Sequence, residues 1–261
     1  MDGVAAFLGG TANVIMQLSL RPVGRGVLES TVDSGKVTLH PLKRLRTTLT
    51  YLAVALMGTD EERAIYREAV NGSHRPVRST ADSPVKYNAF DPQLQLWVAA
   101  CLYWGIDDLQ TRMHGPMAPA KAEAFYQYCA RLGTTLQMRE EQWPPNRAAF
   151  QQYWEANLAT KSIEPALREY FDNLIDLKML SRPTQLLFAR LQRFIVTGLL
   201  PQHLRTEMGM DWTPRDQARF DRILRAIAAV HTRLPRQARM FPMNAYLLDM
   251  RVRRRLGKPL L

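Results

Sequence analysis

The stretch DPQLQLWVAACLYWGI, residues Asp91 to Ile106, is the most apolar run of the chain, and the fold is best approached from it. Asp91 followed by Pro92 is typical of an N-cap and a first helical residue, so a helix is predicted to begin there. The apolar part, residues 94–106, is too short to cross a bilayer, which needs about 20 residues. We therefore expect this helix to be buried at the centre of the molecule.

Helical patterns continue on both sides of this segment, and patterns typical of strands are scarce. Thr59 and Glu62 form a capping-box signature, Pro41 suits a first helical turn, and Gly58 and Gly133 are expected to end helices. Residues 21–40 read as an irregular loop with one short helix near Leu28, and residues 79–90 as a polar loop. The predicted helices cover residues 4–20, 41–57, 59–77, 91–106 and beyond, 119–132, 147–159, 164–178, 183–200, 214–232 and 242–256.

No repeat of solenoid length and no Gly-, Ser- or Pro-rich linker divides the chain. The sequence therefore predicts one all-α globular domain over residues 1–261, with about nine to eleven helices. With 46% hydrophobic and 23% charged residues, the composition is that of an ordinary globular protein.

Positive charge is concentrated at the C-terminal end. Residues 233–261 contain eight basic residues and one acidic residue, a net +7 of the +11 carried by the whole chain. This end is interpreted either as a solvated helix end or as a surface for an anionic membrane. No aromatic residue interrupts RVRRR and no nucleic-acid-binding motif accompanies it, so nucleic acid is not expected as a partner.

Two cysteines, Cys101 and Cys129, form no CxxC pair, which fits a reducing compartment. Residues 3–20 carry no charge and lack the basic start of a signal peptide. We expect a cytoplasmic protein, and peripheral membrane contact through the basic end is left open.

His74 is the first candidate for chemistry. In a helix, Tyr66, Val70, His74 and Val77 share one apolar face, which points the histidine toward the core. It could be a neutral core histidine bonded to a carbonyl, or a ligand of a metal or haem iron. Pro76 bends or ends the helix just after the histidine, and irregular backbone of this kind is common beside functional sites.

A second group of candidates precedes His74. The helix that begins at Pro41 places Arg44, Thr48 (or Thr47) and Tyr51 on one face, beside an apolar stripe formed by Leu45, Leu49, Leu52 and Leu56. Arg44 could be a surface residue with a buried stem, or a donor aimed at an oxyanion or a carboxylate. Glu29 could be solvated, could cap the following turn, or could be a base whose pKa a hydrophobic pocket raises.

Three segments together resemble one family of oxygenases, which includes bacterial rubber oxygenase (latex-clearing protein) and the fungal ER-bound oxygenase MpaB. They are PLKRLRTTLTYLAVALMGTDEE, AVNGSHRPVRS and YNAFDPQLQLWVAACLYWG, and their order and spacing agree with the family over about residues 10–250. GxSxG, HExxH, P-loop and convincing GxGxxG motifs of other enzyme classes are absent from the sequence.

The resemblance implies a globin-like helical core that binds haem b. It makes His74 the axial iron ligand, places Arg44 and Thr48 on the opposite side with dioxygen and substrate, and matches Glu29 to a general base. One departure is Thr47, where rubber oxygenase has a lysine, so a closed state with that lysine on the iron is not expected.

The predicted function is that of a haem b-dependent oxygenase acting on a small apolar, unsaturated or lipid-like substrate. Two alternatives stay open, a haem- or oxygen-binding protein without turnover and a helical interaction module that has lost the cofactor. The electron donor and the oligomeric state do not follow from the resemblance.

Overall fold

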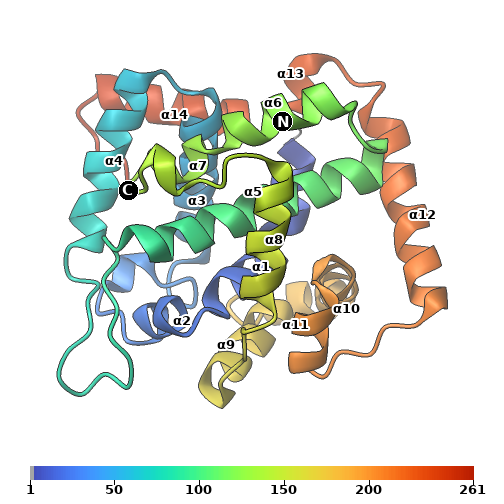
Figure 1. The fold of residues 1–261 in the computed structure, drawn as a ribbon, viewed down its shortest axis with the longest axis horizontal. Helices are drawn as coiled ribbons and strands as arrows, with labels where there is room; N and C mark the ends of the chain where they lie inside the picture. Colours follow the sequence, from blue (N-terminus) through green and yellow to red (C-terminus); the bar gives the residue numbers. More distant parts are fainter. Residues whose placement is uncertain (1–2) are drawn as a thin grey trace.

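The computed structural model describes residues 3–261, apart from the side chain of Ser34, and this part of the chain is built from helices (Figure 1). Within residues 3–261 the extended pairing consists of an isolated bridge between Arg78 and Asn88. The elements are α1 Gly3–Leu18, α2 Arg21–Leu28, η1 Asp33–Gly35, α3 Pro41–Met57, α4 Asp60–His74, α5 Pro92–His114, α6 Pro119–Cys129, α7 Arg131–Thr134, η2 Glu140–Gln142, α8 Arg147–Leu158, α9 Pro165–Ile175, α10 Arg182–Leu199, α11 Gln202–Glu207, α12 Pro214–His231, α13 Arg236–Arg239 and α14 Met243–Arg255.

The all-α prediction is confirmed, whereas the predicted nine to eleven helices are too few for the fourteen α-helices found in residues 3–261. The additional ones, α7, α11 and α13, have four to six residues and are too short to show a hydrophobic period. Gly133 does not end a helix as expected but lies inside α7, where a Cβ atom would meet the Met138 sulfur at 2.4 Å. The globin-like character of the core stays a prediction.

Helix α5 crosses the middle of the molecule, and α1, α7 and α12 pack against it (Figure 1). Trp97 and Cys101 on this helix are almost completely buried. Gly105 lets α1 approach closely, because a Cβ atom there would lie 2.5 Å from the Asn13 side-chain nitrogen. That nitrogen donates a 2.7 Å hydrogen bond to the Cys101 carbonyl. The central position predicted for this segment is confirmed.

Helix α2 occupies residues predicted to be mainly loop. Pro22 lies in its first turn, and Gly24 lets it approach the neighbouring chain, since a Cβ atom there would lie 2.5 Å from both the Leu18 carbonyl oxygen and a Leu167 methyl group of α9. Arg21 and Arg25 both form ion pairs with Glu164, just before α9. These contacts hold α2 against α9 and the residue before it, and Glu29 follows as the C-cap of α2.

The chain leaves α4 directly after His74. Arg75 is the C-cap and precedes Pro76, which has no N–H for the helix ladder. Val77 therefore does not lie on the helix face with His74, contrary to the sequence prediction. Its carbonyl instead accepts a 2.9 Å hydrogen bond from the N–H of Ala89, so residues 77–79 and 87–89 run side by side as the base of the loop predicted at 79–90.

The basic C-terminal end folds back as α14 against α3, beside α4 (Figure 1). Arg251 binds the Glu62 carboxylate with both ends of its guanidinium, at 2.6 and 3.2 Å. Arg254 pairs with Glu61, and Arg253 pairs with Asp249 at 2.8 Å. Three of the four arginines in RVRRR thus have acidic partners inside the molecule.

No single helix in residues 3–261 is long and apolar enough to cross a membrane. The pair α1 and α2 meets that test of length and composition when taken together, but the two helices are bent by 107° at their junction. The compartment of the protein stays a prediction.

Candidate functional site

His74 is the last residue of α4, and its ring is held against the edge of Phe90, with centroids 6.5 Å apart and planes at 84°. Nδ1 is completely buried, and neither ring nitrogen makes a hydrogen bond with a residue in the described chain. The interpretation as a core histidine bonded to a carbonyl is therefore wrong. Burial, assisted by the positive charge of Arg44, lowers the pKa of His74 from 6.5 to about 4. The imidazole is neutral at pH 7, the form that binds metals.

Arg44 lies on α3 and faces α4 and α9. Its side chain is exposed to solvent, yet burial lowers its pKa, while Tyr170 of α9 and Tyr66 of α4 act in the opposite direction. Water reaches the side chain although α4 and α9 lie beside it. The guanidinium forms no hydrogen bond or ion pair within residues 3–261. Arg44 is thus a solvent-exposed cation without a counter-ion among the described residues.

Thr48 is one turn after Arg44 on the same face of α3, and its side chain is also exposed. Its hydroxyl makes no hydrogen bond with the described residues. Thr47 is different, because its hydroxyl donates to the Arg44 carbonyl at 3.1 Å and its own carbonyl accepts from the Tyr66 hydroxyl at 3.0 Å. Of the two threonines left open by the sequence, Thr48 is the one with a hydroxyl available to a ligand.

Glu29, at the C-cap of α2, fastens the loop that follows α4. One carboxylate oxygen accepts hydrogen bonds from the Ser83 hydroxyl at 2.6 Å and from the Tyr87 hydroxyl at 2.9 Å. The Ser83 hydrogen bond is the largest influence on the Glu29 pKa, which is lowered with the help of Tyr87 and the charge of Arg25, although burial opposes the shift. The alternative of a base with a raised pKa is therefore wrong.

The structure brings three of the four predicted residues into one region. His74 ends α4, Arg44 and Thr48 project from α3, and the charge of Arg44 acts on the His74 ring. Glu29 contacts the loop after His74 rather than these three side chains. Tyr170, a neighbour of Arg44, was missed, because α9 follows far along the chain and only the tertiary fold places it there.

In the described part of the chain, no group of three or more His, Cys, Asp or Glu side chains lies close enough together to hold a metal ion. Haem iron requires one protein ligand and an enclosed, mainly apolar setting. His74, with a buried nitrogen that lacks a partner, fits that single-ligand requirement. Arg44 could supply the positive charge that stabilises negative charge on a bound group.

Comparison with known proteins shows the family of the chain. The model of the family "ER-bound oxygenase mpaB/B'/Rubber oxygenase, catalytic domain" matches residues 1–229, so the match begins earlier than predicted and ends before α13 and α14. Two mycobacterial proteins are each 47% identical over 247 residues, which cover 95% of this chain and 97% of theirs. They are uncharacterized protein Mb2261 of Mycobacterium bovis and uncharacterized protein Rv2237 of Mycobacterium tuberculosis.

A comparison with solved structures found no match. The family match covers most of the chain and includes the segments that carry His74, Arg44 and Thr48. The chain belongs to the ER-bound oxygenase mpaB and rubber oxygenase catalytic-domain family.

Proposed function

We propose that the protein is a haem b-dependent oxygenase that inserts dioxygen into an apolar, unsaturated or lipid-like substrate. Membership of an oxygenase family supports the reaction class. The observation that carries the proposal is the state of His74, a neutral imidazole with a buried Nδ1 and no hydrogen bond at either nitrogen. A buried polar group without a partner is costly to fold, so its retention needs a reason, and iron ligation supplies one.

His74 would hold the haem iron as the single protein ligand, and bound haem would supply the chemistry that activates dioxygen. The low pKa of His74 keeps protons from competing for the ring nitrogen at neutral pH. The adjacent ring of Phe90 restricts the orientation of the imidazole.

Arg44 and Thr48 would act on the reacting groups. The unpaired guanidinium of Arg44 would stabilise negative charge that develops during the reaction, as donors in an oxyanion hole do. The Thr48 hydroxyl can donate and accept a hydrogen bond, so it would orient a polar atom beside that charge. Both side chains are exposed, so a substrate would reach them from solvent.

Glu29 is proposed to accept a proton from the substrate. Its lowered pKa keeps it ionised at neutral pH, but its two hydrogen bonds also make it a weak base. We therefore expect a smaller contribution from Glu29 than from Arg44, together with its part in holding the loop after His74.

The test of iron ligation is the visible spectrum of protein purified after haem-supplemented expression, oxidised and then reduced with dithionite. Wild type and the control His40→Gln, in which an exposed histidine at the start of α3 is replaced, should show the same Soret band. His74→Ala should lose or shift it. A wild-type protein without a Soret band would contradict the proposal, and the interaction module without cofactor would then be favoured.

Turnover is tested separately by oxygen consumption of the reduced protein with unsaturated lipids. Arg44→Gln should lower the rate by about 100-fold at unchanged haem content, which is the typical effect of removing one such donor. Haem binding without any oxygen consumption would identify the protein as a haem- or oxygen-binding protein instead.

A further inference from the structure

The N-terminal half of α10 exposes four large apolar side chains in succession. Leu186 is 77% exposed, Leu187 69%, Phe188 48% and Leu191 52%. None of them belongs to the hydrophobic core or packs against it, in contrast to Phe194 on the next turns of the same helix. Exposed apolar side chains gathered in one place usually mark an interaction surface.

Uncompensated positive charge surrounds these side chains. Lys178, Arg182 and Arg190 form no ion pair with any residue in the described part of the chain, and α10 contains no acidic residue. Arg193 is different, because it pairs with Asp176 at 2.8 Å and with Asp172 at 3.1 Å. The exposed end of α10 therefore presents three unpaired cations beside its leucines.

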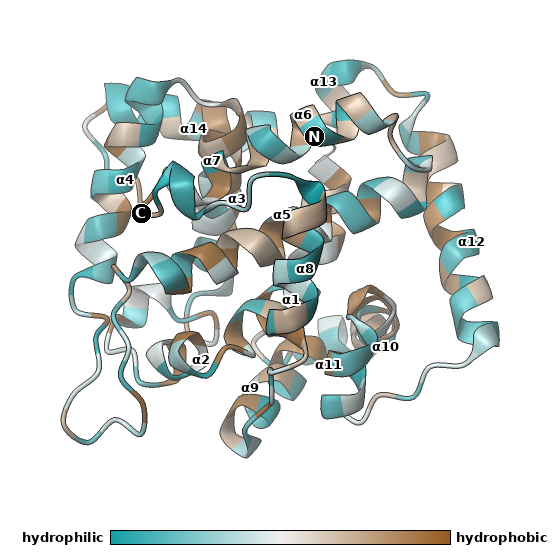
Figure 2. Cartoon of the chain, in the orientation of Figure 1, coloured by the Kyte–Doolittle hydropathy of each residue, from teal (hydrophilic) through white to brown (hydrophobic). Residues whose placement is uncertain are grey.

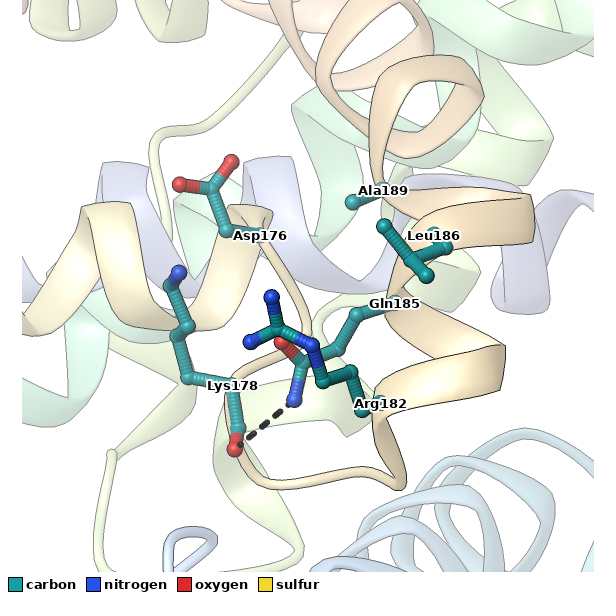
Figure 3. A pocket seen from close by; sticks show the side chains of 6 residues that line it. All are labelled: Asp176, Lys178, Arg182, Gln185, Leu186 and Ala189. Carbon is teal, nitrogen blue, oxygen red and sulfur yellow. Dashed lines mark hydrogen bonds between the residues drawn. The ribbon is translucent and has the colours of Figure 1, made fainter.

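Two of these cations border a hollow of about 240 Å³ between the end of α9 and the start of α10 (Figure 3). Its lining consists of Asp176, Lys178, Arg182, Gln185, Leu186 and Ala189. Asp176 is already neutralised by Arg193, and the Gln185 amide donates to the Leu180 carbonyl at 2.8 Å. Lys178 and Arg182 are thus the groups in this hollow that still lack a partner, which suits an anion such as a phosphate.

We propose that this part of α10 docks on an anionic phospholipid membrane. Leu186, Leu187, Phe188 and Leu191 enter the boundary between head groups and acyl chains, while Lys178, Arg182 and Arg190 contact lipid phosphates. Helices that combine arginines with leucine and phenylalanine bind membrane interfaces in this way, and each basic residue strengthens attraction to an anionic surface. The inference does not rest on the proposed oxygenase activity.

The shape of this region favours a membrane over a protein partner. From Ser181 to Leu191 only Thr184, Gln185 and Ala189 escape high exposure, so the helix end projects from the body on nearly all sides. Figure 2 shows hydrophobic residues on α10, which is seen nearly end-on below and to the right of the centre. A planar, deformable surface can accept such a projection without a matching groove.

Helix α14 provides a matched control surface. It also exposes Leu248 and Val252, at 60% and 43%, among basic residues. Most of its charge is compensated, because Arg251, Arg253 and Arg254 have acidic partners. Helix α14 itself is therefore a weaker candidate for this contact than α10.

The experiment is co-sedimentation of the full chain with vesicles of phosphatidylcholine, with and without phosphatidylglycerol, at low and physiological salt. Wild type should bind only the anionic vesicles, and added salt should weaken binding. Leu187→Ser/Phe188→Ser/Leu191→Ser should lower the partition coefficient by about 10-fold, and Lys178→Gln/Arg182→Gln/Arg190→Gln by about 100-fold. The control Leu248→Ser/Val252→Ser should bind like wild type.

A second measurement guards against variants that fail to fold. In Phe188→Trp the new indole should show a blue-shifted emission with anionic vesicles and none with phosphatidylcholine alone. Absence of that shift, or of wild-type binding, overturns the proposal. So does loss of binding in the α14 control alone, which would assign the membrane to the basic end. If wild type ignores vesicles and the apolar variant converts a dimer to a monomer, a second copy of the chain covers α10 instead.

Discussion

The surroundings of the His74 imidazole change its pKa strongly. A histidine in water has a pKa near 6.5, and the burial of this ring lowers the value to about 4. A charged ring at this place is disfavoured, because protein surrounds much of it and the positive charge of Arg44 acts on it.

This shift predicts a specific loss of stability in acid. Between pH 6.5 and about 4 the unfolded state binds a proton at His74 that the folded state does not, so the free energy of unfolding falls as pH falls. Wild type without haem should lose about 3 kcal/mol more between pH 7 and pH 4 than His74→Gln does. Urea unfolding at several pH values measures the difference. His40→Gln should retain the wild-type profile, and a His74→Gln profile that also matches wild type would show that the ring is not desolvated.

Glu29 gives a second prediction at this scale. Its carboxylate accepts hydrogen bonds from Ser83 and Tyr87, and bonds to a charged acceptor are stronger than neutral ones. Glu29→Gln should lower the free energy of unfolding by about 1–2 kcal/mol and speed amide hydrogen exchange in residues 76–90. In a Tyr87→Phe background the same change should cost less, because one of the two bonds is already gone. Equal costs in both backgrounds would mean that the Tyr87 bond contributes nothing.

At the scale of the helix, the ends of α4 and α5 are set by capping residues that the sequence shows directly. The capping box is confirmed, because the Glu62 N–H donates to the Thr59 hydroxyl at 3.2 Å and the Thr59 N–H donates to the Glu62 carboxylate at 2.9 Å. Asp91 also acts as the predicted N-cap and accepts from the Gln93 N–H at 2.8 Å. These signals are readable in a sequence because both partners lie within one helical turn.

The close crossing of α1 and α5 depends on Gly105, whose presence inside a helix is explained by tertiary packing and not by its sequence neighbours. Gly105 is inside a helix, where glycine is unfavourable, yet a Cβ atom there would lie 2.5 Å from the Asn13 amide. Gly105→Ala should therefore destabilise the protein by about 1–3 kcal/mol through overpacking, as measured by thermal or urea unfolding. Gly10→Ala on α1 is the matched control, since nothing lies within 4 Å of the added atom. It should be neutral or stabilise by up to about 1 kcal/mol, and a loss from Gly10→Ala as large as that from Gly105→Ala would contradict this account.

At the scale of the whole molecule, the chain end is joined to its first half. Arg251 of α14 holds Glu62 of α4, and that carboxylate also caps its own helix. The Arg251 hydrogen bond is the largest cause of the lowered pKa of Glu62. One residue thus contributes to the start of α4 and to the docking of α14.

Removal of the contact between Arg251 and Glu62 should lower the free energy of unfolding more than removal of an unpaired surface charge does. Arg251→Gln should lower the free energy of unfolding by about 1–2 kcal/mol, because Glu62 is left largely buried with a weaker partner. Arg255→Gln removes an equal charge that has no acidic partner in the described chain, and it should change stability by less than about 0.5 kcal/mol. If both variants lowered the free energy of unfolding equally, the contact between Arg251 and Glu62 would contribute no more than any positive charge on α14.

The sequence by itself determined the helical class, most helix boundaries, the central position of residues 94–106 and the family. These features rest on hydrophobic period, caps and motif order, all of which operate over a few residues. His74, Arg44 and Thr48 could be named for the same reason, since each stands at a fixed place in a family segment.

Only the tertiary structure decided what surrounds those residues. It left His74 without a hydrogen bond, gave Arg44 the neighbour Tyr170 and lowered rather than raised the pKa of Glu29. It also paired three of the four arginines of α14. Charge pairs and the neighbours of a buried group come from parts of the chain far apart in sequence, and a pattern read along one segment does not identify them.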